Sequence, residues 1–166
     1  MGYSTATWAG FGEALAAVAG ALTGLLFVAL SVKVDVLTAS RALRSRAAQT
    51  LVLFMISVLV AVLLVAPQPA AAVGWELLAV AVVSGAALLV LDRRAGHSTD
   101  QLTVIRYIEN FSPNTITAVF VGVAGLTFLV KAGGGLYWLI PAAVASLVGG
   151  VVNAWLFLVG LPGRSS

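Results

Sequence analysis

The chain contains no cysteine among its 166 residues and has few charged residues of either sign. The absence of cysteine excludes disulfides, thiolate metal sites and thiol catalysis. Charged residues make up only 9% of the sequence, compared with about 25% in a typical soluble domain. His97 is the only histidine, whereas a zinc site needs several convergent ligands. Most of the groups with which enzymes and metalloproteins do their chemistry are therefore absent or isolated.

Apolar residues are abundant: they form 61% of the chain, and the mean hydropathy is +1.08. A chain of this length has no water-soluble core large enough to bury so much apolar surface. The sequence pI near 9.8 does not indicate nucleic acid, because the formal net charge is only +3 and the basic residues flank apolar runs. This pattern predicts a membrane protein whose basic residues meet anionic lipid headgroups.

Five apolar runs are long enough to cross the hydrocarbon layer as helices. We predict an all-α fold, a polytopic transmembrane helix bundle in which residues 1–166 form one domain. The predicted spans are residues 11–32, 47–66, 75–91, 114–130 and 136–161. The third and fourth spans are short, which leaves open whether both cross fully. Pro141 is expected to bend the fifth span near its outer end.

The basic residues predict how the bundle is oriented. Eight of the nine Lys and Arg residues lie within residues 33–46, within residues 93–106 or at Arg164. Because cationic side chains are retained on the cytoplasmic side, we predict a multi-pass plasma-membrane protein with its N-terminus outside and its C-terminus inside. Amphipathic rings settle at the headgroup level, and five of them fall at the predicted outer boundary: Tyr3, Trp8, Trp75, Tyr137 and Trp138.

The connection between the third and fourth spans is long enough to have structure of its own. Ser98 and Gln101 have the spacing of a capping box at a helix start. Leu102, Ile105 and Ile108 then recur on one helical face. We predict a short amphipathic helix over residues 101–112, lying on the inner membrane surface.

Helix association in lipid depends on close backbone approach at small residues and on a few polar contacts. Small residues recur four apart in the first and fifth spans. The candidates for helix packing are Ala16, Gly20 and Gly24 in the first span, and Ala142, Ser146 and Gly150 in the fifth. Small residues are common throughout this chain, so chance spacing is the alternative explanation.

Asn153 is the most polar residue inside a predicted span, and it must face the bundle, another subunit or a wet cavity. It either forms an interhelical hydrogen bond or contacts a pore or substrate. The other polar candidates within spans are weaker, because hydroxyls can bond to their own helix carbonyls. They are Thr23, Ser31, Gln49 and Thr127, followed by Ser57, Ser84 and Thr117.

Three segments carry a family resemblance: residues 20–31 (GALTGLLFVALS), the arginine-rich connection into the second span with its Pro67-Gln68 end, and residues 153–159 (NAWLFLV). They are similar to a family of small integral membrane proteins of actinobacteria. Some members of that family are labelled modulators of the membrane-bound AAA protease. The resemblance extends over most of the chain and implies a bacterial plasma-membrane location, but it supplies no catalytic residues.

Two functions fit these observations. The first is a non-enzymatic membrane protein that packs with copies of itself, as a homo-oligomer, or with a partner membrane complex. The alternative is a small homo-oligomeric ion channel, with a pore lined by hydroxyls and Asn153. The sequence shows no nucleophile with a base and no paired carboxylates at depth, so we predict no enzyme activity, no cofactor and no metal.

Overall fold

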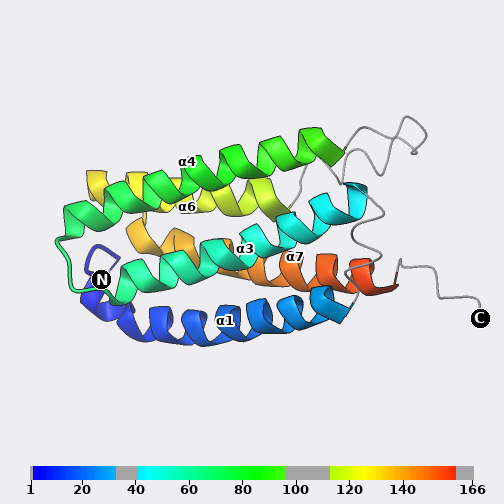
Figure 1. Ribbon diagram of the computed structural model, residues 1–166. Coiled ribbons are helices and arrows are strands. Elements are labelled where there is room, and N and C mark those ends of the chain that lie inside the picture. The colour runs from blue at the N-terminus through cyan, green and yellow to red at the C-terminus, as the bar shows by residue number, and fades with distance from the viewer. Residues whose placement is uncertain (1, 33–40, 96–112, 160–166) are drawn as a thin grey trace, which may run out of the picture.

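The computed structural model describes residues 2–32, 41–95 and 113–159, and within these ranges the chain is helical and contains no strand (Figure 1). This confirms the predicted all-α fold. The elements in chain order are η1 (Thr5–Trp8), α1 (Ala9–Val32), α3 (Arg41–Val65), α4 (Ala70–Ala95), α6 (Pro113–Val130), η2 (Gly135–Trp138) and α7 (Leu139–Val159). The predicted amphipathic helix over residues 101–112 lies outside the described residues.

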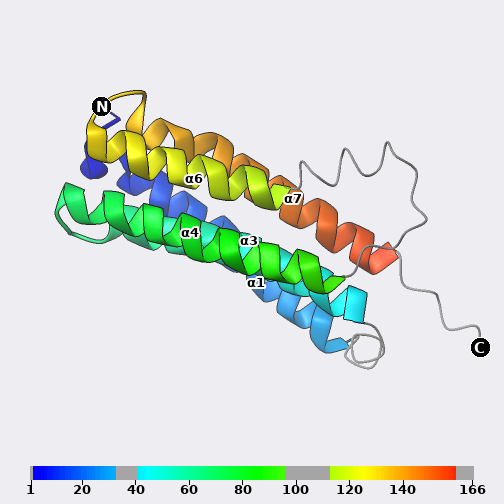
Figure 2. The ribbon, with the colours of Figure 1, turned by 90° about the horizontal axis from the view of Figure 1, so that it is seen from above.

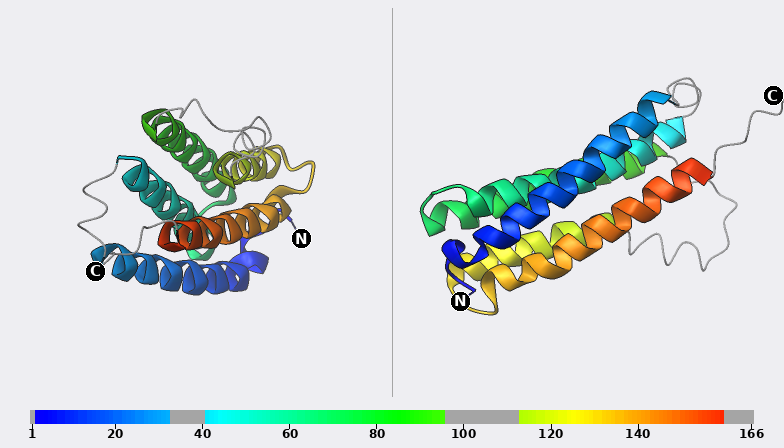
Figure 3. Two further views of the ribbon diagram at one scale, coloured as in Figure 1. Left: turned by 90° about the vertical axis from the view of Figure 1, so that its right-hand side faces the viewer. Right: turned by 90° about the horizontal axis from the view of Figure 1, so that it is seen from below.

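The helices form an antiparallel ring of four with a fifth helix outside it. α3 packs against α1, α4 and α7, and α6 packs against α4 and α7. α3 and α4 form one hairpin and α6 and α7 form another, and the two hairpins lie side by side (Figure 2). Viewed end-on, α1 lies along the outside of the ring (Figure 3, left), and within the bundle it packs mainly against α3. α3 is therefore the central helix of the molecule, and α1 is peripheral.

Four helices contain apolar stretches long enough to cross a membrane: Thr5–Val32, Ala47–Val65, Ala70–Leu91 and Gly135–Trp155. The fourth predicted span corresponds to a shorter apolar helix, Thr115–Val130. The apolar helices indicate a membrane-embedded protein. The five-span count and the orientation remain predictions.

The helix that contains the third predicted span, α4, begins at Ala70, before the predicted start of the span at residue 75. The carbonyl oxygen of Pro69 accepts hydrogen bonds from the N–H groups of Ala72 and Val73, at 2.9 and 3.3 Å, and so nucleates the first turn. Three successive alanines, the best helix formers, then continue it. The added turn makes α4 one of the longest helices of the bundle rather than a marginal span.

The surroundings of Pro141 show how the last helix begins, and the predicted bend there stays a prediction. The chain leaves α6 through Lys131 and three glycines in left-handed backbone conformations, and a 3-10 turn precedes α7. α7 begins at Leu139, so Pro141 stands in its first turn. The N–H groups of a first turn have no intrahelical acceptor, and a proline there removes no hydrogen bond. The left-handed glycines lie before residue 136, so they separate α6 from the predicted fifth span and do not interrupt it.

Large apolar side chains fill the ring and also cover its outside. Phe54, Leu77, Leu136 and Leu139 are at most 1% exposed, whereas side chains such as Leu25, Val82 and Trp155 are more than half exposed. In α3, 44% of the apolar stretch is buried, but only 17% is buried in α1. A surface of this kind suits a lipid environment, and α1 has the largest uncovered share.

Candidate functional site

The buried polar side chains among the described residues are all hydroxyls. They come from four helices and include Ser57, Ser84, Thr117 and Ser146. No charged side chain in the described ranges is buried to this extent. A buried charge without a partner is costly in a low-dielectric interior, and hydroxyls are the polar groups that such an interior accommodates most easily.

Ser57 of α3 and Ser146 of α7 form a direct interhelical hydrogen bond in the middle of the bundle, with an Oγ–Oγ distance of 2.5 Å. Ser146 Oγ also donates to the carbonyl oxygen of Ala143 at 3.1 Å. Since a hydroxyl has one proton, this arrangement makes Ser57 the donor to Ser146. Both side chains are at most 3% exposed, so the pair ties the two helices together within the core.

The small-residue ladder of the fifth span lies in the interior, on this same contact. Ala142 and Ser146 are buried, and Gly150 lies directly against the ring of Phe54, where a Cβ atom would collide. The ladder therefore faces the α3 side of α7. Its small side chains allow the close approach of backbones that helix packing in lipid requires.

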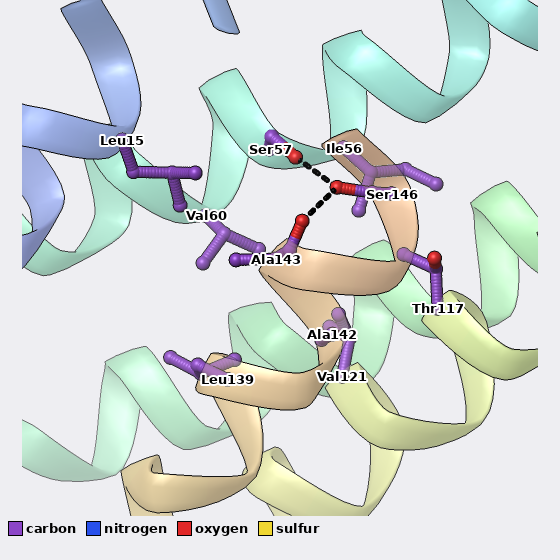
Figure 4. A pocket seen from close by; sticks show the side chains of 10 residues that line it. All are labelled: Leu15, Ile56, Ser57, Val60, Thr117, Val121, Leu139, Ala142, Ala143 and Ser146. Carbon is purple, nitrogen blue, oxygen red and sulfur yellow. Dashed lines mark hydrogen bonds between the residues drawn. The ribbon is translucent and has the colours of Figure 1, made fainter. Parts of the chain in front are cut away.

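A small cavity lies next to the Ser57–Ser146 pair (Figure 4). Its volume, measured as the space open to the centre of a water molecule, is about 10 Å³, which is roughly the room needed for one water. Thr117 of α6 is its third hydroxyl, and the rest of the lining is apolar: Leu15, Ile56, Val60, Val121, Leu139, Ala142 and Ala143. The cavity is thus far too small for an organic substrate.

Tightly packed apolar side chains lie on both sides of this cavity. Phe128 and Leu136 fill the bundle toward the end where α7 begins, and Leu53 and Phe54 fill it toward the other end. All four are at most 3% exposed. Hydrophobic filling of this kind leaves no room for a hydrated ion to pass through a single copy of the described bundle at these levels.

Several other hydroxyl candidates bond to the backbone of their own helix. Each donates to the carbonyl four residues earlier: Thr23 to Ala19, Ser31 to Phe27, Ser84 to Val80 and Thr127 to Val123, at 2.5–2.8 Å. A hydroxyl satisfied in this way needs no partner on another helix. Thr127 makes one further, long contact of 3.5 Å with the carbonyl of Gly135.

Asn153 and Gln49 are both half-buried. Asn153 stands three residues after Gly150 and seven after Ser146, so it lies on the interior side of α7. Within the described ranges neither side chain has a hydrogen bond to another residue. Gln49 and Asn153 therefore remain candidates for contacts beyond these ranges, with lipid headgroups, water or another chain.

The first-span ladder does not lie at a contact within the chain. Gly20 and Gly24 are exposed, and a Cβ atom on either would meet nothing within 4 Å, while Ala16 is half-buried. α1 instead packs through Gly12, Leu15, Ala19 and Leu26. Each residue along a helix turns by about 100°, and Gly20 and Gly24 consequently point away from α3. Spacing alone could not distinguish between these two faces.

The acidic residues of the described spans, Glu13 and Glu76, are either exposed or hydrogen-bonded within the fold. Glu13 is exposed near the start of α1. Glu76 accepts a hydrogen bond of 2.7 Å from Gln68 Nε2, and the same nitrogen contacts the carbonyl oxygen of Leu63 at 3.3 Å. Gln68 thus joins the end of α3 to the start of α4. No group of His, Asp and Glu among the described residues is arranged to hold a metal ion.

The N-terminal segment closes one end of the bundle, a feature that the sequence did not reveal. The carbonyl oxygen of Gly2 accepts from the Leu136 N–H, and the Tyr3 hydroxyl accepts from the Gly134 N–H, each at 3.0 Å. A Cβ atom on Gly135 would collide with the Gly2 carbonyl. The glycine triplet that precedes α7 was the available signal, because it marks a close backbone approach.

Trp8 belongs to this closure. It is only 7% exposed and packs edge-on against Phe11 and Tyr137, with ring centroids 5.5 and 5.1 Å away. Its ring is therefore covered by other protein side chains, whereas its depth in the membrane stays a prediction. Trp75 and Tyr137 remain at least half exposed at the same end.

The chain matches no family model, no curated protein and no solved structure. The resemblance to the actinobacterial membrane proteins thus remains a prediction from the sequence.

Proposed function

We propose that the protein is a non-enzymatic integral membrane protein that acts by helix packing, and that α1 supplies the packing surface. We define the small-residue face of α1 as Gly10, Ala14, Ala17, Gly20, Ala21 and Gly24, all of which are exposed. This face lies on the side of α1 opposite to the residues that contact α3.

The distribution of glycines carries this proposal. The glycines of α4, α6 and α7 whose surroundings are described all lie against a neighbouring helix: Gly74, Gly85, Gly122, Gly125 and Gly150. The described helical glycines with nothing within 4 Å are Gly10, Gly20 and Gly24, all on α1. Glycine in a helix interior costs about 1 kcal/mol relative to alanine. A contact with another chain offsets that cost, whereas no contact within this chain does.

The occupant of this face is a second copy of the chain or a helix of a partner membrane complex. The sequence resemblance offers one class of partner, a membrane-bound AAA protease, whose assembly or turnover the protein would then regulate. Small side chains on both sides of such a contact let backbones approach closely, as in other glycine-based transmembrane pairs.

The channel alternative has less support. Thr23, Ser31, Ser84 and Thr127 bond to their own helices, and the Ser57–Ser146 pair is enclosed in the core. In the fifth span, the candidate for lining a channel is Asn153, which is half-buried and has no hydrogen bond to another described residue. A pore between copies would need more polar lining than these residues supply.

The proposal is tested by measuring how many copies of the chain assemble in a bilayer and whether a partner complex binds them. Single-molecule photobleaching of labelled protein in liposomes counts the copies per complex, and extraction from native membranes captures a partner complex. Replacing Gly20 and Gly24 with Leu is expected to reduce the assembly to single copies and release any partner. Ala86→Leu is the matched control, because Ala86 is exposed on α4 and gains the same kind of bulk. Assemblies unchanged by the glycine replacements would contradict the proposal.

A further inference from the structure

One carboxylate stands beside the small residues on the outer side of α1. Glu13 comes four residues before Ala17 and seven before Gly20, and these spacings place all three on one side of the helix. The Glu13 side chain is exposed within the apolar stretch Thr5–Val32, and it has no hydrogen bond or ion pair with another described residue. A carboxylate that faces lipid is costly, and such groups usually pair with a positive charge. The surface that meets another chain therefore carries a negative charge near one end.

Lys131 is the complementary charge at the same end of the bundle. Among the described residues of this end, the charged side chains are Glu13, Glu76 and Lys131. Glu76 already accepts a hydrogen bond from Gln68. The Lys131 side chain is exposed and has no partner within the described part of the chain. Glu13 and Lys131 are thus two opposite charges that each lack a described partner.

The two charges lie at a similar depth. Lys131 opens the connection from α6 to α7, and Tyr137 in that connection packs against Trp8, with ring centroids 5.1 Å apart. Glu13 follows Trp8 by five residues, which is about 7.5 Å along a helix axis. The flexible four-carbon stem of a lysine and the shorter stem of a glutamate together can cover a distance of this order. Copies of a membrane protein share one orientation, so Glu13 of one copy stands near the level of Lys131 in its neighbour.

The two charges stand on different sides of the bundle, with α7 between α1 and α6 (Figure 3). The side of α6 that leads to Lys131 presents large apolar side chains: Val119, Leu126 and Val130 are all more than half exposed. Large side chains of this kind fit against a helix face made of small residues, because that face lets the backbones approach closely. A contact between these two unlike surfaces joins one copy to the next.

We propose that the small-residue face of α1 binds the α6 side of a second copy, head to tail, with Glu13 of one copy paired to Lys131 of the next. This inference rests on the proposed function and names the partner as the chain itself. A contact between two identical α1 faces would instead bring two Glu13 carboxylates together, and like charges repel. Head-to-tail contacts between copies close into rings when the rotation allows it.

Energy transfer between donor-labelled and acceptor-labelled full-length protein in liposomes measures the association. Glu13→Gln and Lys131→Gln are each expected to weaken it about 3- to 30-fold, the usual effect of losing a polar contact between membrane helices. Arg44→Gln is the matched control, because it removes an exposed positive charge at the opposite end of the bundle. The control is expected to associate like the wild type.

Charge reversal tests whether the pair joins two copies. Copies with Glu13→Lys alone, or with Lys131→Glu alone, are expected to associate weakly with themselves. An equal mixture of the two is expected to regain association, because every contact between unlike copies then joins opposite charges. A pair formed within one copy would gain nothing from mixing. The recovery also shows that both variants fold.

Three results would overturn the proposal. Stronger association of Glu13→Gln would indicate a contact between two α1 faces. Charge variants that associate like the wild type, while Gly20→Leu with Gly24→Leu stays monomeric, would exclude the charge pair and leave the proposed function standing. Wild-type protein that did not associate with itself would exclude a second copy, and the capture of a partner complex from native membranes would then test the proposed function separately.

Discussion

Single glycines decide how closely the helices of this bundle approach. Gly150 and Gly20 both stand inside apolar helices four residues from another small residue, but their surroundings are opposite. A Cβ atom at Gly150 would collide with Phe54, which is 1% exposed, and a Cβ atom at Gly20 would meet nothing within 4 Å. The same substitution is therefore expected to have opposite effects at the two positions.

Gly150→Ala is expected to destabilise the isolated bundle by about 1–3 kcal/mol, the usual cost of overpacking a core. Gly20→Ala is expected to stabilise it by up to about 1 kcal/mol, because alanine is the better helix former. Unfolding of the monomeric protein in detergent measures both values. Equal changes at the two positions would show that the α3–α7 contact is looser than described.

The Ser57–Ser146 hydrogen bond gives a second prediction for single side chains. Removing either hydroxyl breaks the same interhelical bond, so Ser57→Ala and Ser146→Ala are not additive. A double-mutant cycle is expected to give a coupling energy of about 0.6 to 2 kcal/mol. Pairing Ser57→Ala with Ser84→Ala is the control, because Ser84 bonds to its own helix. A coupling of zero in the first cycle would mean that the pair does not form.

Among the elements, the helices could be predicted from the sequence and their contacts largely could not. Apolar runs flanked by prolines, glycines or charges were enough to locate α1, α3, α6 and most of α4. The start of α4 was missed because three alanines are less apolar than the run that follows them. The 3-10 turn η2 at the start of the fifth predicted span was not predicted, because the left-handed glycines beside it act through backbone geometry.

The candidate site could not be predicted for the same reason: it depends on which helix faces meet, and the sequence locates helices but not their contacts. Small residues on α1 form more than one ladder, and hydropathy does not show which ladder meets α3. A Cβ atom added at Gly12 would lie 3.0 Å from the carbonyl oxygen of Ala61, while Gly20 and Gly24 point outward. The cavity beside Ser57 and Ser146 joins residues of four helices, α1, α3, α6 and α7. Such a site depends on tertiary packing and leaves no local pattern in the sequence.

The N-terminal closure is an element whose role can be tested separately. Tyr3→Phe removes the hydroxyl that accepts from the Gly134 N–H, and the expected cost is about 0.5–1.5 kcal/mol. The Gly134 amide should then exchange its hydrogen faster. The Leu136 amide, which bonds to Gly2, is the internal control and should keep most of its protection. Unchanged exchange at Gly134 would contradict the described contact.

The whole molecule is a filled bundle with an apolar exterior, and this bears on the channel alternative. The cavity admits about one water, and buried leucine and phenylalanine side chains occupy the levels on either side of it. This filling closes a path through one copy, and the polar side chains left to line a pore between copies are few, so we expect wild-type protein in liposomes to pass no ions over a range of voltages and pH values. An ion flux that Asn153→Leu abolished, with assembly intact, would favour the channel.

The proposed function assigns the two sides of α1 to different tasks. Gly12, Leu15 and Ala19 hold the helix on α3, and the small-residue face remains for another chain. α1 is the least covered helix of the four with long apolar stretches. A peripheral helix of this kind can exchange lipid contacts for helix contacts without disturbing the ring of four.

The most direct test is a photo-crosslinking scan along α1 in native membranes. A photoreactive amino acid replaces each residue from Ala16 to Phe27 in turn, and adducts with a second copy or a partner chain are measured. Adducts are predicted to recur every three to four residues, with maxima at Ala17, Gly20 and Gly24 and minima at Ala19 and Leu26. A scan without adducts to another chain, or with adducts of equal yield all around the helix, would contradict the assignment of α1 as the packing surface.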